Sequence, residues 1–244
     1  TQIITVNDDI APVFAAPPAV VTVQCIGDVP APTMLAYTDN CDAAGSVLGT
    51  DGPLVGGNCG GTITRTWTTT DACGNVSIPV TQIITVNDNI PPTGSNPAPI
   101  SVTNLTIPLP DVTVVINEAD NCTVAPTVTF ISEVSDNGIC PEILTRTYRI
   151  TDDCGNFIDV IHTITVGDAM PPTASNPAPL NVQCSIDVPM PDPTVVIDEA
   201  DNSALPTVTW EDDVSDNGSC PETITRRYRV TDDCGNVIFV TQII

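Results

Sequence analysis

The chain has 244 residues, of which 30 are Asp or Glu and only 6 are Lys or Arg, so its formal net charge is −24 at pH 7. This charge repels nucleic acid and anionic membrane surfaces and excludes phosphate-backbone binding as a default function. The chain is nevertheless 41% hydrophobic, which is typical of a folded protein and not of an acidic disordered tail. No apolar run approaches 18 residues, so the sequence predicts no direct insertion into a membrane.

Pro and Gly are frequent, with 24 and 15 residues, and aromatic residues make up only 4% of the chain. This composition favours short strands joined by turns over long helices. The ten cysteines indicate an oxidising compartment, so we expect an extracellular, cell-surface location. The chain opens with what looks like the end of a domain, and we expect it to be an excerpt of a longer secreted protein.

An internal repeat of about 80 residues organises the sequence. The opening segment Thr1–Asp8 recurs at 81–88, in part at 163–168, and begins again at 241–244. We therefore expect residues 1–8 to end a preceding repeat, followed by repeats at 9–88, 89–168 and 169–244, the last with an incomplete final strand. A unit of this size suits a small β-sandwich, so the predicted fold is all-β, with tandem immunoglobulin-like β-sandwich domains in an extended array.

In the second repeat, the pattern predicts strands at 100–107, 112–117, 126–135, 143–151 and 157–166. The strand at 143–151 alternates clearly, which places Leu144, Arg146, Tyr148 and Ile150 on one face. The matching aromatic residue in the first repeat is Trp67 and in the third is Tyr228. We expect this aromatic residue to be the centre of each core.

An arginine precedes each of these aromatic residues by two positions: Arg65, Arg146 and Arg226. Because each shares the face of the aromatic residue, it either stacks on the ring and extends to solvent or pairs with an internal carboxylate. Both alternatives are structural roles. A binding role would need an exposed sheet face.

Four cysteine positions recur in the repeats. Position 1 holds Cys25 and Cys184, position 2 holds Cys41 and Cys122, position 3 holds Cys59, Cys140 and Cys220, and position 4 holds Cys73, Cys154 and Cys234. Asn104 replaces the cysteine of position 1 in the second repeat, and Ser203 replaces that of position 2 in the third.

Strand direction limits the pairing of these cysteines. Positions 3 and 4 flank one strand of about nine residues, roughly 30 Å long, which is far beyond disulfide reach. If strands alternate in direction, positions 1 and 3 share one end of a repeat and positions 2 and 4 share the other. We therefore predict the disulfides Cys25–Cys59, Cys41–Cys73, Cys122–Cys154 and Cys184–Cys220, with Cys140 and Cys234 unpaired. A zinc site is disfavoured because no Cys-x-x-Cys pair exists and His162 is the only histidine.

Three acidic elements recur in each repeat: the linker, an Asp-Asn loop, and an Asp-x-Cys-Gly-Asn turn. Chain direction predicts that all three converge at one end of the sandwich, where clustered carboxylates repel one another unless a cation joins them. Oxygen ligands favour Ca²⁺, so we predict calcium sites there, and two ions per repeat would cancel about half of the net charge. The alternative is that these are ordinary solvated turns without metal.

The Thr-x-x-Val-x-Asp-x-x-x-Pro linker, the Asp-Asn-Cys loop at 39–41 and the Trp-Thr-Thr-Thr-Asp-Ala-Cys-Gly-Asn stretch at 67–75 resemble the HYR-like and bacterial immunoglobulin-like repeats of giant cell-surface proteins, particularly those of gliding and adhesive Bacteroidota. The linker at 87–91 is also similar to cadherin junctions. In such adhesins, carboxylates at domain junctions bind Ca²⁺ and stiffen the array. The resemblance therefore supports the predicted ligands, which are Asp8, Asp39, Asp71, Asp88, Asn89, Asp120, Asp152, Asp168, Asp201 and Asp232.

The predicted function is that of a non-enzymatic spacer in the shaft of a secreted or surface-anchored adhesin or filament, stiffened by calcium at its junctions and by disulfides inside its domains. Its expected partners are the neighbouring repeats of the same chain, and other cell-surface proteins or glycans. The alternative is a carbohydrate- or protein-binding accessory module of a larger secreted enzyme. A glycosidase with paired carboxylates is disfavoured, because near-identical clusters in three repeats suit a structural ion better than a single active site.

Overall fold

The computed structural model describes all 244 residues. The chain packs into two compact units. One consists of Thr1–Ser95, Val115–Thr129 and Arg149–Asp159, and the other of Asn96–Val114, Phe130–Tyr148 and Val160–Ile244.

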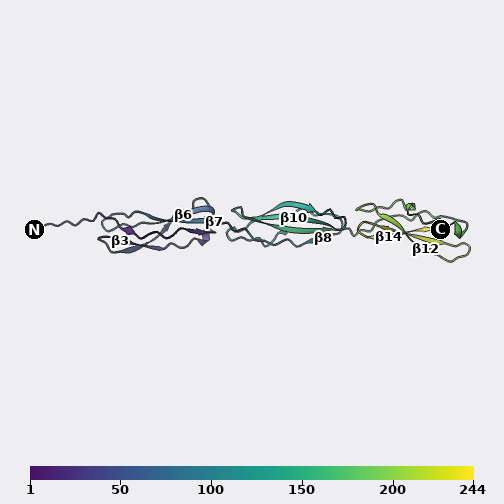
Figure 1. The fold of residues 1–244 in the computed structure, drawn as a ribbon, viewed down its shortest axis with the longest axis horizontal. Coiled ribbons are helices and arrows are strands. Elements are labelled where there is room, and N and C mark those ends of the chain that lie inside the picture. The colour runs from purple at the N-terminus through teal and green to yellow at the C-terminus, as the bar shows by residue number, and fades with distance from the viewer. The chain divides into compact units, whose positions relative to one another are not determined.

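The chain is all-β, as the sequence predicts (Figure 1). Its strands are β1 (Val13–Phe14), β2 (Val21–Val23), β3 (Met34–Thr38), β4 (Gly45–Leu48), β5 (Thr50–Asp51), β6 (Cys59–Trp67), β7 (Val80–Asn87), β8 (Ile100–Val102), β9 (Thr127–Ser135), β10 (Glu142–Thr151), β11 (Phe157–Val166), β12 (Thr207–Ser215), β13 (Ile224–Thr231) and β14 (Val237–Ile243). The helices are three-residue 3-10 turns: η1 (Ile26–Asp28), η2 (Val112–Val114), η3 (Ser185–Asp187) and η4 (Pro193–Val195). No helix is long and apolar enough to cross a membrane.

The first repeat forms two sheets, with strand orders β1-β3-β4 and β2-β7-β6-β5. β6 and β7 are long antiparallel neighbours, and the short strand β2 joins β7 in parallel, with Val21 opposite Ile84. The parallel pair brings the first segment of the repeat, which follows a Pro-rich stretch, alongside its last strand. This arrangement places the loop after β2 and the loop before β6 at the same end of the repeat.

The second repeat forms the sheet β8-β11-β10-β9, and the third forms β12-β13-β14. β8 joins β11 in parallel, with Ile100 opposite Ile164, which repeats the pairing of β2 with β7. β12 and β13 are antiparallel, with a bulge between Trp210 and Asp212. Three antiparallel strands are common to the repeats, as β5-β6-β7, β9-β10-β11 and β12-β13-β14, and the parallel strand is added in the first and second repeats only.

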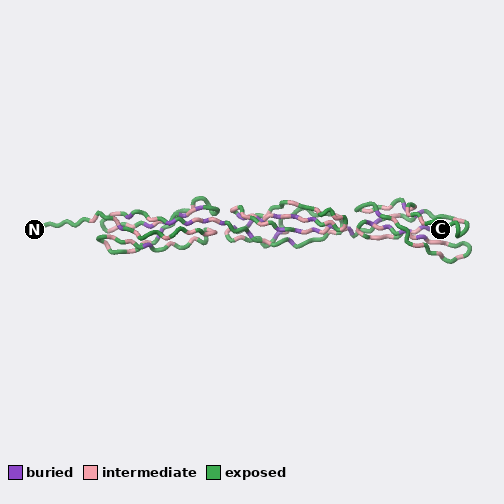
Figure 2. Tube along the Cα trace, in the orientation of Figure 1, coloured by how far each residue is buried: buried purple, intermediate pink, exposed green.

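The aromatic residue on the long central strand is the centre of each core, as predicted. Trp67, Tyr148 and Tyr228 are fully buried. In Figure 2 the buried residues recur at alternate positions of the strands, whereas the loops are mostly exposed. On β10 the buried face is that of Leu144 and Ile150, which confirms the alternation expected at 143–151.

Three of the five strands predicted in the second repeat are confirmed within about one residue, as β9, β10 and β11. The strand predicted at 100–107 is shorter, because only Ile100–Val102 pair with β11. The strand predicted at 112–117 is wrong, since Val112–Val114 form η2 and residues 115–117 belong to no strand. Asp111 accepts hydrogen bonds from the backbone and the hydroxyl of Thr113, and this local bonding competes with a sheet ladder.

Candidate functional site

The linker aspartates Asp8, Asp88 and Asp168 each use one carboxylate oxygen to fix a turn. The Oδ1 atom accepts the backbone N–H two residues later, from Ile10 at 3.1 Å, Ile90 at 3.2 Å and Met170 at 2.9 Å. Asp88 and Asp168 are only 4% and 9% exposed, and the Oδ2 atom of each is buried without a hydrogen-bond partner. A turn alone does not account for this second oxygen, because burying an unpaired carboxylate oxygen is costly.

The aspartates of the Asp-Asn loops, Asp39, Asp120 and Asp201, follow the same rule. One oxygen of each accepts the backbone N–H two residues later, at 3.0 Å from Cys41, 2.9 Å from Cys122 and 2.8 Å from Ser203. The other oxygen is buried and has no partner in all three: Asp39 Oδ2, Asp120 Oδ1 and Asp201 Oδ1.

The aspartates of the Asp-x-Cys-Gly-Asn turns, Asp71, Asp152 and Asp232, are fully hydrogen-bonded. In the first repeat, the backbone N–H of Asn75 donates to Asp71 Oδ1 and its side-chain amide donates to Oδ2, both at 2.7 Å. The same amide donates to the backbone carbonyl of Asp8 at 3.1 Å. The asparagine therefore ties the turn to the linker.

Asn156 and Asn236 repeat this contact in the other two repeats. Their side-chain amides donate to the carbonyls of Asp88 at 3.2 Å and Asp168 at 3.1 Å. The final asparagine of the turn is a residue of the site that the sequence-based prediction does not include. The signal was its recurrence in all three repeats.

The three elements converge as predicted, and candidate donor atoms lie within 4.8 Å of one another in three groups. Two of the groups contain the full predicted trio of carboxylates. These are Asp8, Asp39 and Asp71, and Asp168, Asp201 and Asp232.

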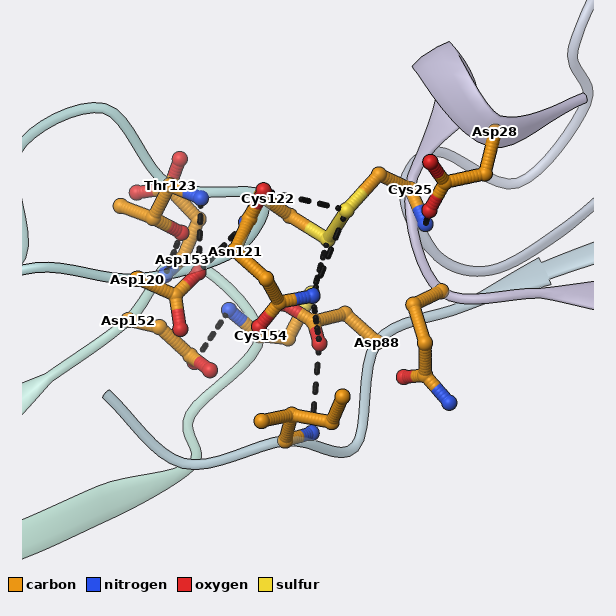
Figure 3. Close-up of a disulfide and its surroundings, with 12 residues drawn as sticks. Cys25, Asp28, Asp88, Asp120, Asn121, Cys122, Thr123, Asp152, Asp153 and Cys154 are labelled. Carbon is orange, nitrogen blue, oxygen red and sulfur yellow. Dashed lines mark hydrogen bonds between the residues drawn. A yellow bond between two sulfur atoms is a disulfide. The ribbon is translucent and has the colours of Figure 1, made fainter. Parts of the chain in front are cut away.

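The group between the first and second repeats consists of Asp88, Asp120 and the sulfur of Cys122. Asp152 lies outside this group, although its turn is nearby (Figure 3). The Cys122 sulfur is part of a disulfide, so it is not a thiolate and is a poor metal ligand. Asn89, another predicted ligand, is exposed and also lies outside the group, and its backbone N–H donates to Gln24 Oε1.

The chemistry of the donors fits a hard cation. Every carboxylate in the groups offers oxygen, which suits Ca²⁺ and not zinc or copper. The turns also favour the ionised acids. Burial opposes ionisation of Asp71, but hydrogen bonds from the Asn75 side chain and the turn backbone prevail and lower its pKa. The Ser203 side chain likewise lowers the pKa of Asp201 against the effect of burial.

The disulfides join neighbouring repeats. They are Cys25–Cys122, Cys59–Cys154 and Cys140–Cys234, with Cα–Cα distances of 5.3, 5.2 and 5.2 Å. Figure 3 shows Cys25–Cys122 beside Asp88 and Asp120. Each bond joins position 1 of one repeat to position 2 of the next, or position 3 of one repeat to position 4 of the next.

The predicted disulfides Cys25–Cys59 and Cys122–Cys154 are therefore wrong, and Cys140 and Cys234 are paired with each other. Cys41, Cys73, Cys184 and Cys220 are free and exposed, so the predicted bonds Cys41–Cys73 and Cys184–Cys220 are not formed in this structure. The prediction treated each repeat as closed on itself. Instead, the end of one repeat that carries positions 1 and 3 meets the end of the next that carries positions 2 and 4, and the bonds cross that junction.

One signal in the sequence pointed to this pairing. The two missing cysteines are at Asn104, position 1 of the second repeat, and Ser203, position 2 of the third. If the bonds formed inside each repeat, the two missing cysteines would leave Cys140 and Cys234 without partners. If the bonds form between repeats, Asn104 and Ser203 face each other as the two positions of one absent disulfide.

The three repeated arginines are buried and each pairs with a carboxylate, as the second alternative predicts, but the carboxylate side chains are 29–34% exposed and are not internal. Arg65 donates to Asp51 at 2.6 and 2.9 Å, and Arg226 donates to Asp213 at 2.8 and 2.7 Å. Arg146 pairs with Glu133. Each also donates to a backbone carbonyl of a proline, at Pro30, Pro108 or Pro189.

Two partly exposed aromatic rings are covered by arginines on the neighbouring strand. The guanidinium of Arg149 lies 3.6 Å from the ring centre of Phe157, and that of Arg227 lies 5.0 Å from that of Phe239. Asp159 and Asp212 hold these arginines in place. These rings therefore do not present a bare platform for stacking a sugar.

Among solved structures, the chain is similar to the protocadherin gammaB7 EC3-6 cis-dimer structure, with 12% identity, a TM-score of 0.36, and coverage of 97% of this chain and 78% of that one. It is also similar to protocadherin gamma B2 extracellular cadherin domains 3–6, with 11% identity, a TM-score of 0.34, and coverage of 98% and 78%. Similarity this low carries no argument about function. No curated protein matches the chain.

The family model for the HYR-like domain with 4 cysteines matches residues 13–86 and 172–244. These two segments lie in the first and third repeats and include cysteines of all four positions. Together they make up more than half of the sequence. The chain therefore belongs to the family of HYR-like domains with four cysteines.

Proposed function

We propose that the chain is a mechanical spacer in an extracellular adhesin or surface filament, with repeats at 9–88, 89–168 and 169–244 whose junctions are held by disulfides and by calcium. The observation that carries this proposal is the recurrence of one arrangement at three linkers. At each, a linker aspartate and a loop aspartate lie together, and at least one buried carboxylate oxygen has no partner.

A cation would satisfy these oxygens and remove the repulsion between the acids. The loop and linker aspartates already have their remaining oxygens fixed by backbone N–H groups, so their side chains need little reordering on binding. Asp8 and Asp39, Asp88 and Asp120, and Asp168 and Asp201 would hold the ion. Calcium would thereby connect the linker to the next repeat, and at the Asp88 and Asp168 linkers disulfides also cross there.

A surface adhesin of the gliding or adhesive Bacteroidota type is the context that the linker and cysteine motifs suggest. The alternative is a binding module of an enzyme: arginines lie over the rings of Phe157 and Phe239, and Trp210 is 47% exposed on β12. A catalytic role has no comparable support. The carboxylates of each group recur in three copies and are tied into turns.

Calcium binding is tested first by stoichiometry. Isothermal titration calorimetry with Ca²⁺ on the metal-free chain should detect three sites. Asp8→Asn should remove one of them, because it halves the charge that Asp8 and Asp39 present together. The matched control is Asp9→Asn, which removes the same charge from the adjacent, exposed position and should leave three sites.

Stability provides the second readout. Calcium at a concentration 100 times its dissociation constant should stabilise a site by about 2.7 kcal/mol relative to chelator. Asp168→Asn should abolish this gain in the third repeat. Equal loss of sites in Asp8→Asn and Asp9→Asn, or no binding by the unchanged chain at 10 mM Ca²⁺, would contradict the proposal.

A further inference from the structure

The four free cysteines are not scattered. Cys41 and Cys73 occupy positions 2 and 4 of the first repeat, and Cys184 and Cys220 occupy positions 1 and 3 of the third. We call the end that carries positions 2 and 4 the linker end of a repeat, and the end that carries positions 1 and 3 its far end. The chain thus has one free pair of thiols on a linker end and one on a far end.

The linker end of the first repeat reproduces that of the second, which is disulfide-bonded. Cys41 and Cys122 each donate a backbone N–H to the loop aspartate two residues earlier, at 3.0 and 2.9 Å. The preceding asparagine amide lies 3.1 Å from the Cys41 sulfur and 2.8 Å from that of Cys122. Cys41 is therefore held in the conformation that Cys122 has in its bond with Cys25.

The Cys73 turn matches those of Cys154 and Cys234, which are bonded. In all three turns the backbone N–H of the glycine after the cysteine donates to the carbonyl of the aspartate two residues before the cysteine, at 3.3 to 3.4 Å. The final asparagine of each turn also holds the linker carbonyl. The backbone around Cys41 and Cys73 is therefore held in the same way as the backbone around the disulfide-bonded Cys122 and Cys154.

The far end of the third repeat likewise reproduces far ends that are bonded. Cys184 precedes η3 as Cys25 precedes η1. The cysteine carbonyl accepts the backbone N–H of the residue three positions later, from Asp187 at 2.9 Å and from Asp28 at 3.0 Å. The Cys220 loop matches the Cys140 loop. In each, an aspartate accepts a glycine N–H at 2.8 Å and a second N–H seven residues later, at 3.0 Å for Asp216 and 2.9 Å for Asp136.

Cys184 and Cys220 also line one cavity of about 460 Å³, together with Gln183. In the bonded junction the corresponding glutamine, Gln24, accepts the backbone N–H of Asn89 from the next repeat. The far end of the third repeat therefore offers both thiols and a backbone-recognition group on one surface.

We propose that these two surfaces are the complementary halves of a two-disulfide junction, and that the partner of each is the opposite end of another four-cysteine HYR-like repeat. A second copy of this chain carries both ends. Two copies would join head to tail through Cys184–Cys41 and Cys220–Cys73, following the pairing rule that the three existing bonds obey. This inference concerns covalent assembly and does not depend on calcium.

Each new bond requires an oxidant, and a low-molecular-weight disulfide serves. Two protein thiols and one glutathione disulfide give one protein disulfide and two molecules of glutathione, with the two electrons passing to the glutathione sulfurs. The reaction proceeds by thiolate attack through a mixed disulfide, and the two protons given up by the protein thiols are taken up by the two departing glutathione thiolates.

The test uses the full chain at high concentration in a glutathione redox buffer, without denaturant, analysed by non-reducing electrophoresis and peptide mapping. The unchanged chain should form a ladder of oligomers that reducing agent collapses, and mapping should recover Cys184–Cys41 and Cys220–Cys73. A variant with Cys41→Ser and Cys73→Ser, and one with Cys184→Ser and Cys220→Ser, should each remain monomeric. An equimolar mixture of the two variants should stop at the dimer.

These variants leave the three existing disulfides untouched, so each should have the same circular dichroism spectrum as the unchanged chain. A spectrum that differs would identify a variant that fails to fold. Oxidation that closes Cys41 onto Cys73 within one chain would overturn the proposal. So would a ladder from either double variant alone, since that requires pairing of like ends.

Discussion

The acidic residues at each linker end differ in what their two carboxylate oxygens do. In Asp71, Asp152 and Asp232, both carboxylate oxygens accept hydrogen bonds within their turns. In a second set, one carboxylate oxygen accepts a hydrogen bond and the other is buried without a partner: Asp39, Asp88, Asp120, Asp168 and Asp201. The first set therefore shapes the site, and the second set supplies the oxygens for which a cation is the natural partner.

The buried arginines show a second use of acidic residues. Asp213 accepts two hydrogen bonds from Arg226, which lower the pKa of Asp213 against the opposing effect of burial. A carboxyl whose pKa is lower in the folded state stabilises the fold above the unfolded-state pKa of about 3.9. That stabilisation is lost as the pH falls through the folded-state value.

Asp213→Asn should therefore destabilise the third repeat at pH 7 by about 1–2 kcal/mol, because the buried guanidinium keeps only part of its hydrogen bonding. The difference from the unchanged chain should shrink as the pH falls through the folded-state pKa of Asp213. Hydrogen exchange of the β13 amides, corrected for the intrinsic pH dependence, measures it. Glu211→Gln, an exposed acid on the same strand, is the control and should change little at any pH. A difference of the same size at every pH would mean that lost packing and not charge is responsible.

At the scale of the elements, the segment beside the last strand of each repeat places position 1 at the junction. β2 and β8 pair in parallel with the last strand of their own repeat and lead to position 1, which is Cys25 in the first repeat and Asn104 in the second. In the third repeat the corresponding segment forms no regular strand, but Leu180 donates its N–H to the carbonyl of Ile243 before the chain reaches Cys184. Position 3 is carried at the start of the central strand or in the loop before it. The two positions reach the same junction from different segments, so each junction has room for two disulfides.

The first junction has both bonds and the second has one, because Asn104 and Ser203 occupy the remaining places. Asn104→Cys together with Ser203→Cys should form a fourth disulfide with the Cys140–Cys234 bond intact. It should stabilise the junction by about 2–4 kcal/mol. Non-reducing peptide mapping and guanidinium unfolding measure both effects.

The control for this variant is Asn104→Cys together with Asn202→Cys, which places the second thiol one residue away from position 2 and should bond less completely. If the cysteine introduced at 104 were instead recovered bonded to Cys140, the pairing rule between repeats would fail.

At the scale of the whole molecule, the two junctions should respond differently to loss of calcium. Two disulfides at the first junction oppose rotation about either bond, whereas a single bond at the second permits it. The carboxylate group Asp168, Asp201 and Asp232 carries three negative charges in one place, and without a cation these repel.

Chelation should therefore make the array more flexible, with the larger change at the second junction. Small-angle scattering in Ca²⁺ and in chelator should show a broader distribution of sizes in chelator. Spin-label distances across each junction should broaden mainly at the second. The Asn104→Cys and Ser203→Cys variant is the control and should remove this difference. Identical scattering profiles in Ca²⁺ and chelator would count against stiffening by calcium.

The sequence by itself determined much of the local structure. The 80-residue repeat, the alternation of β10, the buried aromatic residue of each core and the convergence of three acidic elements all follow from periodicity and chain direction. These are properties of neighbouring residues or of one strand, and one sequence contains them. The segment at 112–117 shows the limit, because side-chain bonding at Asp111 outweighs the strand propensity of its valines.

Only the tertiary structure decided which cysteines pair and which carboxylate oxygens are left without a hydrogen-bond partner. Strand direction correctly placed positions 1 and 3 at one end and positions 2 and 4 at the other, but it cannot say whether an end closes on itself or meets a neighbour. That choice depends on which surfaces pack together, and Cys25 lies within bonding distance of Cys122 only because the Asp88 linker brings two repeats end to end.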